Sequence, residues 1–234
     1  MKRGTVLALL PVLAAQGLWV RARVPRLPEA SGPRSGRGGA GAPLRVLIIG
    51  DSSAAGVGVA LQDDALSGQL AARLGHAYDV TWELHARSGA TTAQVLAEVT
   101  AMDLGQFDVA VVGLGVNDCK NGVPLARWVA QSCTLYDLLR TKYGVRLICA
   151  SALPPMGDLP ALPRPLSTAM AAWAALFDAA LAGMVAQMPD LRRVRPDIAI
   201  DAQVMATDGF HPGPLVYAAW AEAVAAEVET LTQR

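Results

Sequence analysis

The chain has 234 residues, with 20 Lys and Arg against 20 Asp and Glu, so its formal net charge is zero. Because no basic surplus is available for a nucleic-acid backbone, nucleic acid is excluded as an expected partner. The three cysteines are too few and too scattered for a disulfide framework or a zinc site. We expect buried free thiols, with a Cys119–Cys133 bridge as the alternative if the domain is exported.

Residues 1–20 have the pattern of a targeting segment, either a signal peptide or an N-terminal membrane anchor. The uncharged stretch 5–20 is flanked by basic residues on both sides: Lys2 and Arg3 before it, and Arg21, Arg23 and Arg26 after it. As a helix this stretch spans roughly 24 Å, short of the ~30 Å hydrocarbon core of a bilayer. That length suits a signal sequence or a short anchor, so the protein is expected to be membrane-anchored or exported, with possible membrane association through this segment. The basic flanks leave the orientation open, and we favour the periplasmic side.

Residues 21–43 are rich in Pro, Gly and Arg and poor in bulky apolar side chains, which predicts a linker. One folded domain is therefore expected over 44–234. Within it, short apolar runs predict five strands, at 44–49, 80–86, 107–114, 145–150 and 194–200. Amphipathic stretches predict helices at 66–74, from 91 or 92 to 101, 124–143, 167–187 and 215–231.

Strand and helix alternate along this domain, and most of the strands are nearly continuously apolar. Such strands are typical of a parallel sheet covered on both faces. The fold class predicted is α/β, a three-layer α/β/α sandwich with a five-stranded parallel sheet. Three polar or glycine-rich turns, at 50–53, 87–89 and 115–118, each follow a predicted strand. The carboxyl ends of parallel strands share one edge, so these turns should converge on one ligand site.

Ser52 and His211 stand out as a nucleophile and its base. Ser52 lies in a tight turn after Gly50, where its hydroxyl would be exposed, and His211 follows Asp208 by three residues. At that spacing the carboxylate can reach the imidazole, fix its tautomer and stabilise the imidazolium. His76 and His85 are expected to be structural or solvent-facing.

Four short motifs in this order resemble those of the SGNH hydrolases, the GDSL esterase/lipase superfamily. They are Gly50-Asp51-Ser52, the glycine Gly89 after the second strand, the GxND block 115–118, and the DxxH block 208–211. The resemblance implies the flavodoxin-like SGNH fold and the catalytic residues Ser52, Asp208 and His211. It also implies an oxyanion hole built from the Ser52 N–H, the Gly89 N–H and the Asn117 amide. Ser53 departs from the family pattern, which has Leu there.

The function expected is hydrolysis of carboxylic esters or thioesters through an acyl-serine intermediate, with no metal or cofactor. The substrate is expected to be a small acyl ester, lipid-like or of short to medium chain length, and the protein a monomer. The alternatives are an acyltransferase or a carbohydrate O-acetylesterase on the same fold, or a catalytically silent binding domain. An intact triad argues against the last.

The Pro-rich segment 152–166 follows the fourth predicted strand and should lie at the active-site edge. Leu153, Pro154, Pro155, Met156 and Leu159 are predicted to wall an acyl pocket. Met170, Trp173 and Met184 of the next helix are expected in the core, with a substrate-lining role as the alternative. Asp51 and Asp118 are interpreted as structural carboxylates, Asp118 holding the loop or a neighbouring helix terminus.

Overall fold

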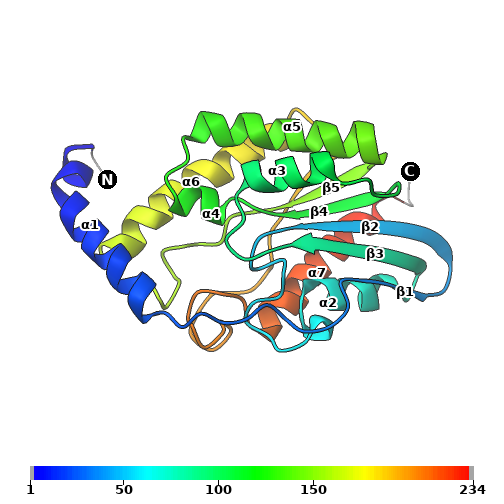
Figure 1. Ribbon diagram of the computed structural model, residues 1–234, viewed down its shortest axis with the longest axis horizontal. Helices are drawn as coiled ribbons and strands as arrows, with labels where there is room; N and C mark the ends of the chain where they lie inside the picture. Colours follow the sequence, from blue (N-terminus) through cyan, green and yellow to red (C-terminus); the bar gives the residue numbers. More distant parts are fainter. Residues whose placement is uncertain (1–2, 232–234) are drawn as a thin grey trace.

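A six-stranded sheet in the order β1-β3-β2-β4-β5-β6 forms the centre of the computed structural model, which describes residues 3–231 (Figure 1). Its strands are β1 (Ser35–Gly39), β2 (Ala42–Gly50), β3 (Tyr78–Ala86), β4 (Val109–Gly113), β5 (Leu147–Ser151) and β6 (Leu191–Val194). Strands β2 to β6 pair in parallel, and β1 pairs antiparallel with β3. The predicted α/β sandwich and its five parallel strands are confirmed.

Helices cover both faces of the sheet (Figure 1). On one face lie α3 (Thr92–Ala101), α5 (Leu125–Tyr143) and α6 (Leu166–Val185), and on the other lie α2 (Leu66–Leu74) and α7 (Pro214–Glu229). A 3₁₀ turn, η1 (Gln62–Asp64), precedes α2, and the short α4 (Val116–Lys120) follows β4. Each face has its own apolar core, because β4 and the second half of β2 are buried on both sides.

The sheet differs from the prediction at its two edges. The predicted fifth strand, 194–200, is instead β6 at Leu191–Val194, and the chain leaves the sheet before Pro196. Strand β1, with the sequence SGRGG, lies inside the segment 21–43 that was predicted as a linker. It has no apolar pattern to reveal it, and two of its glycines, Gly36 and Gly39, allow close packing. A Cβ on Gly36 would lie 2.9 Å from the indole nitrogen of Trp82.

Helix α1 (Arg3–Arg23) lies at the end of the molecule where the parallel strands terminate, beside α6 (Figure 1). The Gln16 side chain joins the two helices: its amide nitrogen donates to Arg164 O at 2.7 Å, and its oxygen accepts the Leu166 N–H at 3.0 Å. The second bond satisfies one of the free N–H groups that begin every helix. Gln16 therefore caps α6 while it fixes α1.

Helix α6 is long and apolar enough to cross a membrane by length and composition alone. Its buried residues, among them Met170, Phe177 and Leu181, pack into the core beneath it, so α6 is a layer helix of the sandwich. All three cysteines are free thiols: Cys119 and Cys149 are buried and Cys133 is half-buried. The alternative bridge between Cys119 and Cys133 is therefore not formed.

Candidate active site

Ser52, His211 and Asp208 form a continuous hydrogen-bonded chain at the carboxyl edge of the sheet. His211 Nε2 lies 2.9 Å from Ser52 Oγ, and His211 Nδ1 lies 2.5 Å from Asp208 Oδ2. The sequence separation between the serine and the histidine is bridged by the fold, since β2 ends at Gly50 and α7 begins just after His211. The three predicted residues are therefore brought together in the order that proton transfer requires.

The turn that carries Ser52 packs closely against β4 and is hydrogen-bonded by a side chain of α7. A Cβ on Gly50 would lie 2.5 Å from Ala54 Cβ and 2.6 Å from Gly113 O, so only glycine allows this close approach to β4. From α7, the buried Tyr217 hydroxyl contacts Ser53 O at 2.9 Å and Val57 O at 2.7 Å. Tyr217 belongs to no motif in the sequence, and only the structure reveals its contacts to the nucleophile turn.

The Asp208 carboxylate organises its own loop as well as the imidazole. Its Oδ1 accepts the backbone N–H groups of Phe210 and His211, both at 2.9 Å. Burial raises the pKa of this carboxyl, but the hydrogen bonds from the His211 side chain and the two N–H groups outweigh burial, and the net pKa lies below its ordinary value. Asp208 is therefore held ionised beside the ring.

Two backbone N–H groups in the cavity lining, those of Ser52 and Gly89, are available to a ligand. Neither the Ser52 N–H nor the Gly89 N–H donates to an acceptor within the described part of the chain. Gly89 has φ +80°, a conformation that favours glycine, and a Cβ there would meet no atom within 4 Å. Both residues line the same cavity.

Asn117 lines this cavity too, but its amide is already engaged. Its Nδ2 donates to Asp51 Oδ2 at 3.2 Å and to Ala90 O at 3.1 Å. To donate to an oxyanion, Asn117 would have to exchange one of these two long contacts for the ligand. The two backbone N–H groups have no acceptor among the described residues, whereas the Asn117 amide already donates to Asp51 and Ala90.

Asp51 and Asp118 both act as structural acceptors, as expected. Asp118 accepts the Thr92 N–H at 3.0 Å and the Thr92 hydroxyl at 2.9 Å, and so holds the start of α3. Asp51 accepts the Ser53 N–H at 3.0 Å and the Asn117 amide. Burial raises the pKa of Asp51 to about 6, although the Ser53 N–H and nearby His211 both oppose this rise.

The loop that carries Gly89 is held by residues that the sequence interpretation assigned to the linker. Glu29 Oε1 accepts the Ser88 N–H at 2.6 Å, and Glu29 Oε2 pairs with Arg34 at 2.5 Å. Arg34 in turn donates to Ala86 O at 2.5 Å, at the end of β3. No sequence pattern marks this ion pair, because its partners lie in a Pro- and Gly-rich stretch.

A cavity of about 1660 Å³ extends from Ser52 and His211 between α1 and α6. Of the five residues predicted to wall it, only Met156 lines the cavity, and it also packs in the core. The prediction is wrong for the other four: Leu153 and Leu159 are core residues, and neither Pro154 nor Pro155 is in the described lining. Met170 both lines the cavity and packs in the core, and Met184 is core. The core prediction is wrong for Trp173, which is 47% exposed and lines the cavity. The part of the chain that the structure describes holds no cluster of three or more His, Cys, Asp or Glu suited to a metal ion.

Solved structures share this fold at low sequence identity. TesA is similar with a TM-score of 0.63 and 20% identity, over 80% of this chain and 99% of that chain. The psychrotrophic esterase EstA from Pseudoalteromonas sp., inhibited by monoethylphosphonate, has a TM-score of 0.60 and 16% identity, over 81% and 99%. The Clostridium thermocellum family 3 carbohydrate esterase has a TM-score of 0.63 and 16% identity, over 82% and 98%. No curated protein matches the sequence.

The sandwich and the side chains at its carboxyl edge place the protein in the class of ester hydrolases. Within that class, the profile of the GDSL-like Lipase/Acylhydrolase family matches residues 48–219. The chain belongs to this family, and the family predicted from the four motifs is confirmed.

Proposed function

We propose that the protein hydrolyses lipid-like or short- to medium-chain acyl esters, including thioesters, through an acyl intermediate on Ser52. The observation that carries this proposal is the chain Ser52 Oγ–His211 Nε2 at 2.9 Å and His211 Nδ1–Asp208 Oδ2 at 2.5 Å. In this arrangement the neutral imidazole presents Nε2 as the acceptor for the serine proton, because Asp208 holds the proton on Nδ1.

The reaction then runs in two halves. Ser52 Oγ attacks the carbonyl carbon while its proton passes to His211 Nε2, and the imidazolium is stabilised by Asp208. The negative oxygen of the tetrahedral adduct accepts the free N–H groups of Ser52 and Gly89, and Asn117 turns one amide hydrogen from Asp51 or Ala90 towards it. His211 gives its proton to the departing alkoxide or thiolate. Water, deprotonated by His211, next attacks the acyl-serine; the bond between the acyl carbon and Ser52 Oγ breaks, His211 returns the proton to Oγ, and the acid is released.

The apolar walls of the cavity favour an acyl chain over a sugar. Leu13, Met170 and Trp173 line it, and the described lining holds many more apolar side chains than charged ones. An acyl chain buried there gains about 0.8 kcal/mol per methylene. The test below also distinguishes the three alternative functions, which are a carbohydrate O-acetylesterase, an acyltransferase and a silent binding domain.

A phosphonate probe and an ester panel test the proposal. We expect a fluorophosphonate to add one adduct to Ser52, located by mass spectrometry of peptides, in the wild type and in Ser53→Ala but not in Ser52→Ala. The same three proteins are assayed on p-nitrophenyl esters of increasing chain length and on acetylated sugars. A best rate on acetylated sugars would replace the acyl-lipid proposal, and an adduct on Ser53 would overturn the choice of nucleophile. Reaction with the probe without hydrolysis would point to an acyltransferase, and no reaction at all to a binding domain.

We also propose that α1 associates with the membrane. Its exposed apolar side chains include Leu10, Leu18 and Trp19, with exposed fractions of 48%, 69% and 52%, and of these Trp19 lies outside the cavity lining. Arg23 lies over the Trp19 ring at 5.9 Å, a pairing suited to the headgroup region of a bilayer. Co-sedimentation with anionic phospholipid vesicles should fall for Trp19→Asp, which lies outside the cavity lining, compared with a surface control such as Gln69→Asp on α2. Equal sedimentation of all three proteins would contradict this proposal.

Two predictions need other measurements. A topology reporter tests the periplasmic location, and light scattering tests the monomeric state.

A further inference from the structure

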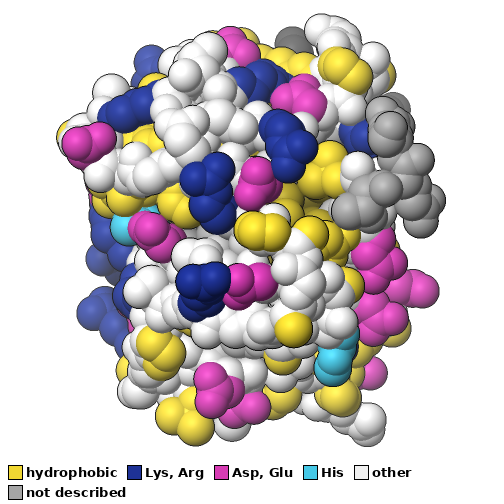
Figure 2. All heavy atoms as spheres, turned by 90° about the vertical axis from the view of Figure 1, so that its right-hand side faces the viewer, with side chains coloured by type: hydrophobic (Ala, Val, Ile, Leu, Met, Phe, Trp, Pro, Cys, Tyr) yellow, Lys and Arg dark blue, Asp and Glu magenta, His cyan; other side chains and the backbone are white. Residues whose placement is uncertain are grey.

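Three basic side chains line the active-site cavity without a carboxylate partner. They are Arg21 at the end of α1, Arg26 three residues beyond that helix, and Lys120 at the end of α4. Over residues 3–231, no ion pair is formed by any of the three, although most other arginines of the molecule have one. Figure 2 shows the opposite end of the molecule, where basic and acidic side chains are both spread over the surface.

Asp51 is the acidic side chain in the described cavity lining; its charge favours the Lys120 ammonium, but one carboxylate does not balance three cations. It is 3% exposed, and it accepts hydrogen bonds from the Ser53 N–H and from Asn117. The cavity therefore combines apolar walls with an excess of positive charge. This combination complements a ligand that has an apolar chain and an anionic group.

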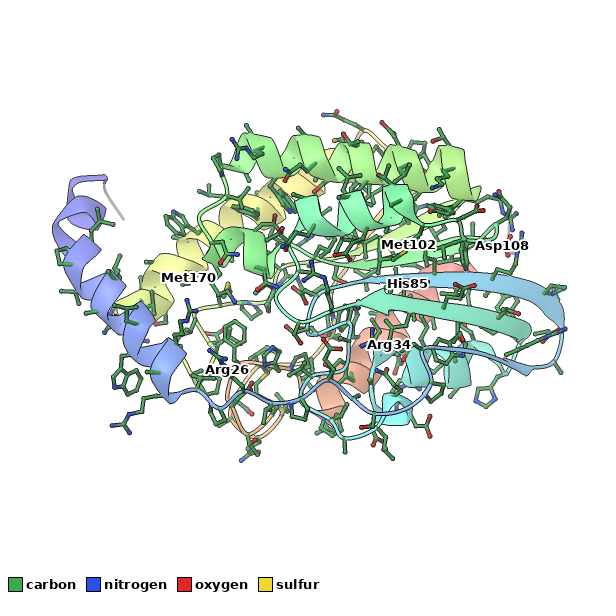
Figure 3. The ribbon with its side chains drawn as sticks, in the orientation of Figure 1. Arg26, Arg34, His85, Met102, Asp108 and Met170 are labelled. Atoms are coloured by element: carbon green, nitrogen blue, oxygen red, sulfur yellow. The ribbon has the colours of Figure 1, made fainter. Side chains whose placement is uncertain are left out.

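Helices α1 and α4 place Arg21 and Lys120 in the lining of the cavity that holds Ser52. Lys120 lies three residues after Asn117 on α4, so both face the cavity from adjacent positions of one helix turn. On α1, Leu13, Gly17 and Arg21 follow at intervals of four and form one face. In chain order along this face, the apolar Leu13 precedes Arg21. Arg21 lies near the C-terminal end of α1, which is the end nearer the loops that follow the strands (Figure 1). In Figure 3, Met170 on α6 and Arg26, which follows α1 in the chain, lie on the same side of the molecule as α1.

Arg21 and Lys120 repel one another in this arrangement. Partial burial lowers the pKa of the Lys120 ammonium, Asp51 opposes this effect, and the charge of Arg21 adds to it. Lys120 nevertheless keeps an exposed surface, so its ammonium can reach a ligand in the cavity. A bound anion between the two cations would relieve the repulsion and form charge-assisted hydrogen bonds with both.

We propose that Arg21 and Lys120, with Arg26 beside them, bind a phosphate group carried on the alcohol side of the acyl ester, while the acyl chain lies between α1 and α6. The inference rests on the proposed function, because it names the substrate class of that same site: acyl esters of phosphorylated alcohols, such as acylglycerol phosphates. It also makes α1 part of the substrate site.

Two esters that differ only in the phosphate test the substrate class. The full-length protein is assayed on monododecanoylglycerol and on its phosphate ester, both below their critical micelle concentrations. We expect a higher kcat/KM for the phosphate ester, and a ratio between the two esters that falls about tenfold for each cation removed, in Arg21→Gln and Lys120→Met. The matched control is Arg23→Gln on the same helix, which lies over Trp19 and does not line the cavity, and which should keep the wild-type ratio.

A binding measurement separates this inference from the hydrolytic function. Dodecyl phosphate has no carboxylic ester to cleave, and its Kd for the Ser52→Ala protein is read from tryptophan fluorescence, with inorganic phosphate and dodecanol as comparison ligands. We expect dodecyl phosphate to bind more tightly than either, and its Kd to rise about tenfold when Arg21→Gln is added. An unchanged Kd, or equal binding of dodecanol, would overturn the anion site even if esters are hydrolysed. Equal binding of inorganic phosphate would show a free-anion site and overturn the assigned substrate class. If no ester is hydrolysed but dodecyl phosphate binding depends on Arg21 as expected, the proposed function fails and the anion site stands.

Discussion

Replacing Asp208 by Asn should separate its role in the imidazole tautomer from its role in the loop. In the wild type, Oδ2 accepts from His211 Nδ1 and Oδ1 accepts two backbone N–H groups. An Asn side chain can keep its oxygen on the two N–H groups, which leaves its NH₂ facing Nδ1. That NH₂ donates, so the ring must carry its proton on Nε2, and Nε2 can no longer accept the Ser52 proton.

The expected loss is about 10⁴-fold in kcat, or about 5 kcal/mol of transition-state stabilisation, because the base is removed while the site stays assembled. Asp208→Ala removes the loop bonds as well. Leaving the Phe210 and His211 N–H groups without their acceptor should cost roughly 1–3 kcal/mol of unfolding free energy. The melting temperature of Asp208→Ala should therefore fall by several degrees, at about 2–4 °C per kcal/mol, while that of Asp208→Asn stays near the wild type.

The assays are steady-state hydrolysis of a p-nitrophenyl ester and thermal unfolding followed by circular dichroism. More than a tenth of the wild-type kcat in Asp208→Asn would refute the tautomer argument. Equal melting temperatures for the Ala and Asn variants would refute the argument that the loop depends on Oδ1.

Three further results are expected. Asn117→Ala should lower kcat by roughly 10²- to 10³-fold with a similar KM, and an unchanged kcat would remove Asn117 from the oxyanion hole. Gly115→Ala, at φ +114° with its Cβ 3.1 Å from Leu153, should lose more unfolding free energy in urea than Gly122→Ala, at φ +69° with open space around it; equal losses would contradict the steric argument. The folded-state pKa of Asp51 is raised from 3.8 to about 6, so its contribution to stability is complete below 3.8 and is lost as the pH rises through 6. The wild type should therefore lose about 3 kcal/mol relative to Asp51→Asn between about pH 4 and pH 7, and parallel stability curves would show that Asp51 does not titrate in this range.

The interior of the fold could be predicted because its strands carry their own signal. The LRVLII and FDVAVVGL runs are apolar at nearly every position, since both faces of β2 and β4 are covered. The helices α2 and α3 begin and end where their residue patterns indicated. The order of the polar turns then followed from the parallel topology, and this brought Ser52 and His211 to one edge.

The parts that escaped prediction depend on backbone pairing or on single side chains. Strand β1 pairs through its backbone and has no apolar residue, so it resembles a linker. The Glu29–Arg34 pair and the Gln16 contacts each join segments that no periodicity connects. The cavity lining could not be predicted either, because it depends on how α1 packs beside α6. That packing is why Trp173 faces a cavity rather than the core.

The two edges of the sheet bear on how the protein behaves at high concentration. An exposed edge strand offers unpaired backbone groups to another chain, and long apolar edges invite aggregation. One edge is β1, which has five residues, three of them glycines, and whose Arg37 pairs with Asp79. The other edge is β6, which has four residues with two arginines at its centre. A second copy could extend the sheet by only a few hydrogen bonds, and at either edge it would meet arginines already held in ion pairs with Asp79, Glu227 and Asp178. The apolar strands of this sheet are thus enclosed between two edges that resist self-association.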